Sequence, residues 1–333
     1  MIVGLSYDLK EAVPLGRDCA DDALEEYDSQ ETVDAIAGAL EAQGHPVVGL
    51  GGGREFLSNI MREPVDLVFN IAEGLGNLRS REAQVPSILE MLDIPYSGSD
   101  PQCLAICLDK PLAKKLAAAA GVATPRWRVL ANARQLAEPV WDGFPFPAFV
   151  KPSHEGSSKG ITCHRAENAA EATDLAAEIL SRYRQPVMVE EFIAGDEITV
   201  GVIGNSPPAV LGVMRIVPRR HEPYFVYSIE VKRDWENLVD YECPARLEPH
   251  VLQAVIESSL SAFEVLRCRD LARIDFRIAP DGVPYFLEVN PLPGLNPHSG
   301  DLPIMASRLG LTYEALVAAI LAAASERCAR CRV

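Results

Sequence analysis

The segment from Arg273 to Ser299 constrains this chain most, because two apolar, strand-like runs flank the pair Asp281-Gly282. An Asp-Gly pair between such runs is typical of a tight β-hairpin turn. A turn centred there brings four polar side chains onto one face of the hairpin, since successive side chains alternate between faces. The facing pairs are Arg273 with Asn290 and Asp275 with Glu288. The core face would carry Ile274, Phe276, Ile278, Tyr285, Leu287 and Val289.

Opposed carboxylates at Asp275 and Glu288 repel each other unless a cation lies between them. Their oxygens and the Asn290 carbonyl are hard ligands that suit Mg²⁺ held against substrate phosphates. The adjacent Arg273 and the Pro- and Gly-rich run after the hairpin favour a functional site. The alternative is a solvated polar strand face without a ligand.

Length and composition set the broad class of the protein. With 333 residues, of which 48% are hydrophobic, two or three domains with sizeable cores are expected. A formal net charge of -16 argues against a general nucleic-acid partner. Without an apolar run of membrane-spanning length or a signal peptide, we expect a cytoplasmic protein that has no membrane partner.

The eight cysteines are scattered through apolar segments, which indicates reduced buried thiols rather than a disulfide framework. The pair Cys328 and Cys331 could bind metal or undergo redox chemistry. It lacks a second ligand pair, however, and lies in a basic tail that we expect to be frayed.

The first hundred residues predict a small α/β unit. Ser29 is a suitable N-cap for a helix ending near Gly44. Glu73 follows the third predicted strand, at the carboxyl end where open α/β sheets bind ligands. The expected strands are Met1–Tyr7, Pro46–Leu50 and Asp66–Ile71, with a turn at Gly51–Gly53 and a helix at Glu82–Asp93.

Three lysines, Lys110, Lys114 and Lys115, begin the next predicted helix, which Asp109 caps. Cations oppose the helix dipole at that end, so either a bound anion relieves the conflict or the lysines are simply solvated. Lys151 lies in an apolar strand and needs an anionic partner if it is buried. The Gly/Ser loop 154–160 could present N–H groups to phosphate or be a plain turn.

The remaining chain alternates strands and helices around one long polar segment, 218–243, which is irregular enough for a mobile lid. The expected strands are 147–151, 161–164, 187–192, 198–203 and 209–216, and the expected helices are 167–183, 247–266 and 312–325.

The order of these motifs resembles the ATP-grasp superfamily and, within it, the D-alanine–D-alanine ligase family. The motifs are Ile94–Ser99, Leu108–Lys110, Phe149–Pro152, Glu155–Ser158, Val189–Ile193, Gly195–Glu197, Cys243–Ala245, Ala272–Phe276, Glu288–Asn290 and Pro293–Ser299. The resemblance implies an α/β fold with α+β parts. It would comprise an N-terminal domain (1–100), a central ATP-grasp subdomain (101–187) and a C-terminal domain (188–333) with the metal site and lid.

The resemblance also implies a role for each matching residue. Phosphates of ATP would be bound by Lys110, Lys151, Ser157, Ser158 and Lys232, the adenine by the backbone of Glu190 and Glu191, and the ribose by Glu197. Two Mg²⁺ ions, with Mn²⁺ as an alternative, would be held by Asp275, Glu288 and Asn290. Arg273 and the backbone at Gly294 would stabilise a tetrahedral intermediate, and Ser299 and Glu73 would contact substrate.

The implied activity is an ATP-dependent carboxylate–amine ligase that joins amino acids through an acyl phosphate. Its partners would be small amino-acid or carboxylate substrates and a second copy of the chain in a homodimer. Donor-side positions depart from the family pattern at residues 6–28 and 73–82, so a donor other than D-alanine is expected. Arg79 and Arg81 could bind an extra acidic group on that donor or could be solvated.

Two alternatives remain open at this point. One is a related tailoring ligase that joins an amino acid to a non-alanine carboxylic donor. The other is a nucleotide-binding protein without turnover, although such a binder would not need both Asp275 and Glu288. Carbamoyl-phosphate-type and biotin-carboxylase-type enzymes share the ATP site, but Ser299 and the chain length fit them less well.

Overall fold

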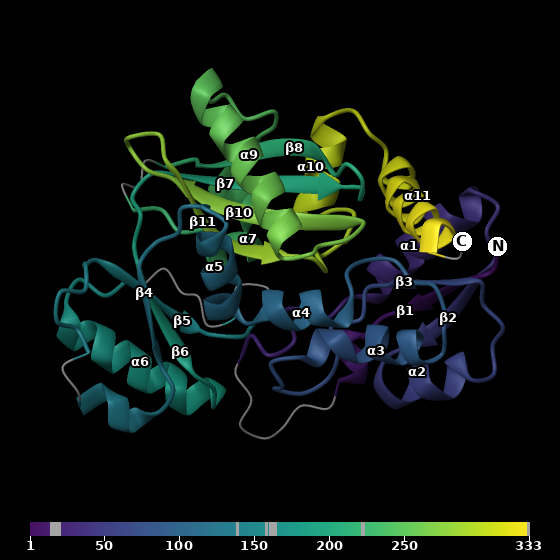
Figure 1. Ribbon diagram of the computed structural model, residues 1–333, viewed down its shortest axis with the longest axis horizontal. Helices are drawn as coiled ribbons and strands as arrows, with labels where there is room; N and C mark the ends of the chain where they lie inside the picture. Colours follow the sequence, from purple (N-terminus) through teal and green to yellow (C-terminus); the bar gives the residue numbers. More distant parts are fainter. Residues whose placement is uncertain (14–20, 138–139, 157–158, 160–164, 221–223, 332–333) are drawn as a thin grey trace.

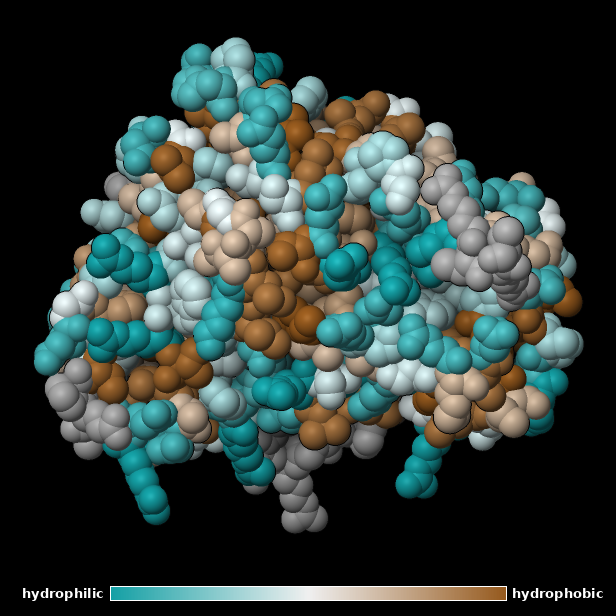
Figure 2. Space-filling view, in the orientation of Figure 1, coloured by the Kyte–Doolittle hydropathy of each residue, from teal (hydrophilic) through white to brown (hydrophobic). Residues whose placement is uncertain are grey.

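The computed structural model describes residues 1–13, 21–137, 140–156, 159, 165–220 and 224–331. Three β-sheets organise these residues, and helices cover their faces (Figure 1). Figure 2 shows hydrophobic residues gathered near the middle of one face, with polar residues around them. The mixed α/β architecture confirms the predicted fold class, whereas the domain boundaries near residues 100 and 187 stay predictions.

The N-terminal sheet is parallel, in the order β2-β1-β3. Ser29 caps α1 as predicted, accepting a hydrogen bond from the Thr32 N–H. The triple glycine ends β2 and also begins a helix, α2, which the sequence pattern did not indicate. The elements are β1 (Val3–Ser6), η1 (Lys10–Ala12), α1 (Gln30–Ala42), β2 (Val47–Gly51), α2 (Gly53–Ile60), β3 (Leu67–Asn70), η2 (Arg81–Ala83) and α3 (Gln84–Met91).

The central sheet is antiparallel, in the order β4-β6-β5, and α6 covers it. Asp109 caps α5 through the Leu112 N–H, as predicted. The predicted strand at 161–164 lies outside the described residues. The elements are α4 (Pro101–Leu108), α5 (Lys110–Ala119), β4 (Trp127–Leu130), η3 (Ala133–Ala137), β5 (Ala148–Pro152), α6 (Ala169–Tyr183) and β6 (Val187–Glu191).

The largest sheet has five antiparallel strands in the order β11-β10-β7-β8-β9. The segment predicted as irregular between residues 218 and 243 contains two short helices and the edge strand β9, because apolar residues such as Ile229 anchor it. The elements are β7 (Asp196–Ile203), β8 (Ala209–Pro218), α7 (Ile229–Arg233), α8 (Trp235–Leu238), β9 (Val239–Glu242), α9 (Pro249–Val265), β10 (Leu271–Ile278), β11 (Pro284–Asn290), α10 (Asp301–Arg308) and α11 (Tyr313–Cys331).

Both faces of this sheet are covered. One face packs Val200, Ile274 and Phe276 against α9 in a fully buried core. On the other face, Gly201 and Gly212 are paired neighbours. A Cβ at Gly201 would come within 2.8 Å of Leu302, so the missing side chains let α10 approach the sheet closely. This approach places the first residue of α10 beside β10, where the polar cluster described below is formed.

The C-terminal helix α11 packs against α1 and so returns to the N-terminal part of the chain (Figure 1). The predicted end of this helix near Ser325 is wrong, since it continues through Cys331. Among the described residues, no single helix is long and apolar enough to span a membrane. Helices α10 and α11 pass that test only as a pair, which is bent by 113° at its break.

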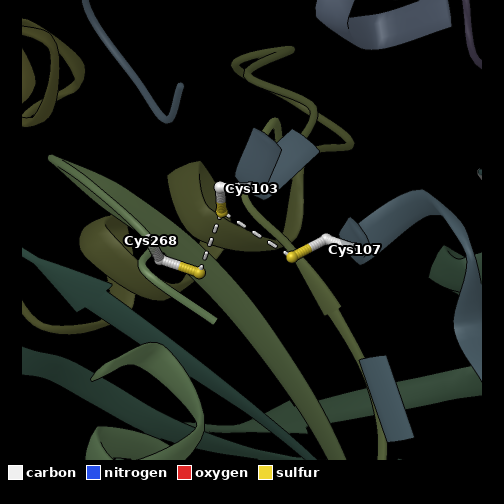
Figure 3. A group of neighbouring side chains, drawn as sticks. All are labelled: Cys103, Cys107 and Cys268. Carbon is white, nitrogen blue, oxygen red and sulfur yellow. Dashed lines mark hydrogen bonds between the residues drawn. The ribbon is translucent and has the colours of Figure 1, made fainter. Parts of the chain in front are cut away.

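Three thiols meet in the core between α4 and the start of β10 (Figure 3). The Cys103 Sγ lies 3.8 Å from that of Cys107 and 3.7 Å from that of Cys268. All three are buried, and the five cysteines whose side chains are described are free, which confirms the prediction of reduced thiols there. Cys243 and Cys328 are only partly buried.

Candidate active site

The hairpin of β10 and β11 has the predicted facing pairs at the polar cluster, although its turn differs from the predicted one. The turn spans Ala279 to Gly282, with the Gly282 N–H bonded to the Ala279 carbonyl at 2.8 Å, so the two-residue turn is wrong. That turn alone would shift the pairing by one residue. A bulge at Leu287 restores it, and Asp275 pairs with Glu288 and Arg273 with Asn290 as predicted.

The same bulge changes which residues of β11 face the core. Phe286 is fully buried against Phe276, whereas Tyr285 and Leu287 are only partly buried. The prediction that Tyr285 and Leu287 belong to the core face is therefore wrong. The predicted positions Ile274, Phe276, Ile278 and Val289 are buried.

The polar face of the hairpin extends onto β7, which pairs with β10 on its other side. Thr199 lies opposite Asp275 and donates its hydroxyl to the Asp275 carboxylate at 3.0 Å. Glu197 lies opposite Arg277, and their side chains form an ion pair at 3.1 Å. Asp275 and Arg277 on β10 thus each have a polar cross-strand partner on β7 that holds the side chain in place.

Arg273 is the centre of this face and is largely buried. Its guanidinium contacts Asp275 at 2.9 Å and Asp301 at 3.1 Å, and it lies 3.8 Å from Glu288. The Asn290 amide also donates to Asp275 at 3.3 Å. Asp301 was not predicted from the sequence, because the helix it begins, α10, was not predicted and the contact depends on how α10 packs.

Glu288 completes the cluster with a second cation, the Lys110 ammonium, at 3.0 Å. Burial opposes ionisation of Glu288, but Lys110, Lys151 and Arg273 together outweigh burial and hold its pKa well below the usual range. The cations that relieve the predicted carboxylate repulsion are here the protein's own side chains. The hard oxygen ligands still suit a divalent ion.

Lys151 has the anionic partner that its position requires. Its ammonium lies 2.8 Å from Glu190, which also pairs with Lys114, and all three side chains are buried. Burial lowers the pKa of Lys114 to about 8 despite the attraction of Glu190. Of the lysines at the start of α5, Lys110 and Lys114 therefore contact carboxylates, and only Lys115 is exposed. The pairing with Glu190 was not foreseen.

Two neighbouring cavities border the polar face. The larger one, of about 390 Å³, is lined by Arg273, Asn290, Lys110, Gly294, Ser299 and Glu73, together with other residues. The smaller one, of about 80 Å³, is lined by Lys151, Glu190, Glu191, Glu197, Asp275 and Glu288, together with other residues. Tyr227, Lys232 and Asp301 border both cavities. All predicted site residues that the structure describes thus line one cleft, and Ser157 and Ser158 lie outside the described residues.

The predicted lid segment contributes Lys232 from α7. The Lys232 ammonium lies 5.0 Å from the centre of the Tyr227 ring, and the neighbouring Arg233 forms an ion pair with Glu25. Tyr227 also donates its hydroxyl to Asp301 at 3.2 Å. The segment therefore connects the N-terminal part of the chain to the polar cluster, and its mobility stays a prediction.

Comparison with known proteins assigns the family. Residues 116–322 match the family model described as the D-ala D-ala ligase C-terminus. The D-alanine–D-alanine ligase of Aquifex aeolicus (strain VF5) is 33% identical over 88% of this chain and 94% of its own. The chain belongs to the D-alanine–D-alanine ligase family. It is accordingly an ATP-dependent ligase, which confirms the activity that its motifs imply.

Solved structures show the same fold. The Bacillus anthracis D-alanine–D-alanine ligase in complex with ATP has a TM-score of 0.76 and 23% identity, covering 99% of both chains. The VanG D-Ala:D-Ser ligase of Enterococcus faecalis has a TM-score of 0.72 and 22% identity, covering 97% of this chain and 98% of its own. The fold of this ligase is therefore the ATP-grasp fold.

In this ligase, Arg81 is not free to bind a substrate anion as the sequence suggested. It is fully buried and pairs with Glu26 at 2.6 Å and with Glu155 at 3.3 Å. Lys159 contacts the same two carboxylates at 2.9 and 2.6 Å. Arg79 pairs with Asp109 and is 74% exposed. Arg79 and Arg81 therefore do not support a donor with an extra acidic group.

The ligase also contains a carboxyl group that destabilises the folded state at neutral pH. Glu82 is 7% exposed, and burial raises its pKa to about 7. Because the folded pKa lies above the unfolded value, its stabilising contribution is complete below pH 4.5 and is lost as the pH rises through 7. We expect Glu82→Gln, which mimics the protonated form, to be about 2–3 kcal/mol more stable than the parent at pH 8.

The measurement is urea unfolding at several pH values. The difference between Glu82→Gln and the parent should shrink toward zero at pH 5, while Glu41→Gln on the exposed side of α1 serves as the matched control. A difference that does not change with pH would show that Glu82 is ionised normally in the folded protein.

Proposed function

We propose that this protein joins a carboxylate of one amino acid to the amine of another by way of an acyl phosphate. The observation that carries the proposal is the position of Arg273, which lines the larger cavity, while its partners Asp275 and Glu288 line the smaller one. A cation held there by three carboxylates can stabilise charge that develops where the two substrates meet.

The residues of the smaller cavity support a nucleotide site. Lys151 would bind phosphate oxygens, Glu197 the ribose hydroxyls, and the backbone at Glu190-Glu191 the adenine. Lys110 and Lys232 would bind phosphate from the neighbouring cavity. Asp275, Glu288 and Asn290 would hold Mg²⁺, which when bound supplies charge neutralisation to the phosphates. Lys110 and Lys151 are already oriented by Glu288 and Glu190, so little reorganisation of these two lysines is needed when ATP binds.

The residues of the larger cavity support an amino-acid site. In the proposed reaction the donor carboxylate attacks the γ-phosphorus of ATP, and the bond from that phosphorus to the bridging oxygen breaks as ADP leaves. The neutral acceptor amine then attacks the acyl carbon, the bond from that carbon to the phosphate oxygen breaks, and the proton that the nitrogen loses leaves with the phosphate. Arg273 and the backbone at Gly294 would stabilise the oxyanion of the tetrahedral intermediate, and Ser299 would bind the acceptor carboxylate.

The donor is proposed to differ from D-alanine, in keeping with the tailoring-ligase alternative. The support comes from the N-terminal wall of the larger cavity, to which Glu25, Glu26, Asp28, Glu73 and Glu82 contribute. Among these carboxylates, Glu73 and Glu82 form no ion pair with the described residues, and a single small α-ammonium group does not require both.

The proposal is tested by phosphate release from Mg²⁺-ATP in the presence of amino acids offered singly and in pairs, with mass spectrometry of the products. We expect ADP, phosphate and a dipeptide in equal amounts. Calorimetry should show ATP binding that requires Mg²⁺ and raises the melting temperature by mass action. Absence of ATP binding, or ADP formation that is independent of any amino acid, would contradict the proposal.

A further inference from the structure

The N-terminal wall of the larger cavity carries carboxylates that lack partners. Glu25 pairs with Arg233, and Glu26 pairs with Arg81 and Lys159. Glu73 and Glu82 form no ion pair and no side-chain hydrogen bond among the described parts of the chain. Both nevertheless line the cavity, Glu73 from the segment after β3 and Glu82 from η2.

Burial makes this arrangement unusual. Glu82 is only 7% exposed, and Glu73 is half-buried at the cavity surface. An ionised carboxylate at a buried position without a partner is costly, so the charge favours a cation in the cavity. Burial also raises the pKa of Glu73, and repulsion from Glu82 and Glu26 adds to the effect.

The cations nearest to Glu82 are already engaged. Arg81 is held by Glu26 and Glu155, and Lys110 by Glu288 and the Glu155 carbonyl. The other titratable groups that act on Glu82 are Glu26, Glu73 and the Cys103 thiol of α4, and none of them supplies positive charge. Among the described residues, no cation therefore forms an ion pair with Glu82 or Glu73.

We propose that Glu73 and Glu82 form a subsite for a cationic side chain, so that the donor is an amino acid with a second ammonium or a guanidinium group. This inference rests on the proposed function, which places the donor in the larger cavity. The two carboxylates would accept charge-assisted hydrogen bonds from the cation. They would also select against neutral side chains, because a neutral group would leave the buried acids unpaired.

The test compares amino acids of matched length that differ in charge. Ornithine is compared with norvaline, and lysine with norleucine, as D and L isomers, with phosphate release from Mg²⁺-ATP as the readout. We expect kcat/KM to be at least about tenfold higher for the basic member of the pair, since one well-placed charge contact is worth that factor or more. The preference should increase from pH 6 to pH 8, because Glu82 gains charge over that range.

Two variants assign the preference to the subsite. Glu82→Gln and Glu73→Gln should each reduce the basic-to-neutral ratio of kcat/KM at least about fivefold, whereas the exposed control Glu41→Gln should leave it unchanged. A ratio near one in the parent protein, or an unchanged ratio in both subsite variants, would overturn the inference.

Calorimetry with ornithine and norvaline separates this inference from the proposed function. Preferential binding of ornithine that is lost in Glu82→Gln, without phosphate release from ATP, would leave the subsite valid and refute the ligase chemistry proposed for these substrates. Phosphate release that proceeds equally well with norvaline would support the ligase chemistry and refute the subsite. Failure of ornithine to bind and to react would also refute the subsite.

Discussion

Glu288→Gln is expected to lower kcat by at least about 100-fold, the largest catalytic effect that the structure predicts for a single conservative change. The carboxylate is a proposed Mg²⁺ ligand, and it also holds Lys110 at 3.0 Å. Glutamine keeps the size of the side chain but removes the negative charge. Weaker metal binding and a misplaced lysine both reduce stabilisation of the transferring phosphoryl group.

The measurement is steady-state phosphate release at increasing Mg²⁺ concentration, together with the melting temperature of each protein. Asp275→Asn should behave in the same way, because Asp275 is a second proposed ligand. Glu264→Gln, an exposed position on α9, is the control and should resemble the parent protein. Turnover near the parent level for Glu288→Gln at limiting Mg²⁺ would rule out the metal-site assignment.

Glu190→Gln is expected to produce the largest loss of stability, about 3–5 kcal/mol at pH 7. The carboxylate is 3% exposed and neutralises two buried ammonium groups, Lys114 and Lys151. Removing its charge leaves both lysines without a counter-ion in a medium that solvates them poorly. The loss should diminish as the pH rises from 7 to 9, because Lys114, whose pKa is already lowered to about 8, can give up its proton.

Urea unfolding of Glu190→Gln and of Glu191→Gln gives a direct comparison of neighbouring positions. The Glu191 side chain is only partly buried and accepts one hydrogen bond, from the Arg126 N–H, so its change should cost less than about 1 kcal/mol. Equal effects at the two positions would mean that the lysine pair does not depend on Glu190.

The hairpin illustrates how much of the site the sequence could predict. Its strands are neighbours in the chain, and side-chain alternation applies to any strand, so the facing pairs Arg273–Asn290 and Asp275–Glu288 followed from local pattern. The turn was nevertheless misplaced, and the register survived because the bulge at Leu287 compensates. The family motifs supplied the remaining residues that are proposed to bind ATP and metal, and the described ones line the two neighbouring cavities.

The N-terminal part of the site was predicted less well. The sequence placed Glu73 near a ligand, but it left open whether Arg79 and Arg81 bind an anion or are solvated. Arg81 is instead fully buried between two carboxylates, one of them far along the chain at Glu155. The sequence shows which charged residues are present but not which of them form ion pairs with one another. The ion pairs decide which charged side chains remain available to bind a substrate.

Local sequence pattern was enough to predict the elements whose residues are close in the chain: the capped helices α1 and α5, the apolar strands, and the polar face of the β10–β11 hairpin. Local hydrogen bonding and side-chain alternation suffice for these. The pairing of Glu190 with Lys114 and of Asp301 with Arg273, and the position of Glu82 on the cavity wall without an ion pair among the described residues, depend on the tertiary structure. These ion pairs and the burial of Glu82 depend on packing between distant segments, since burial removes the water that would otherwise solvate each charge separately.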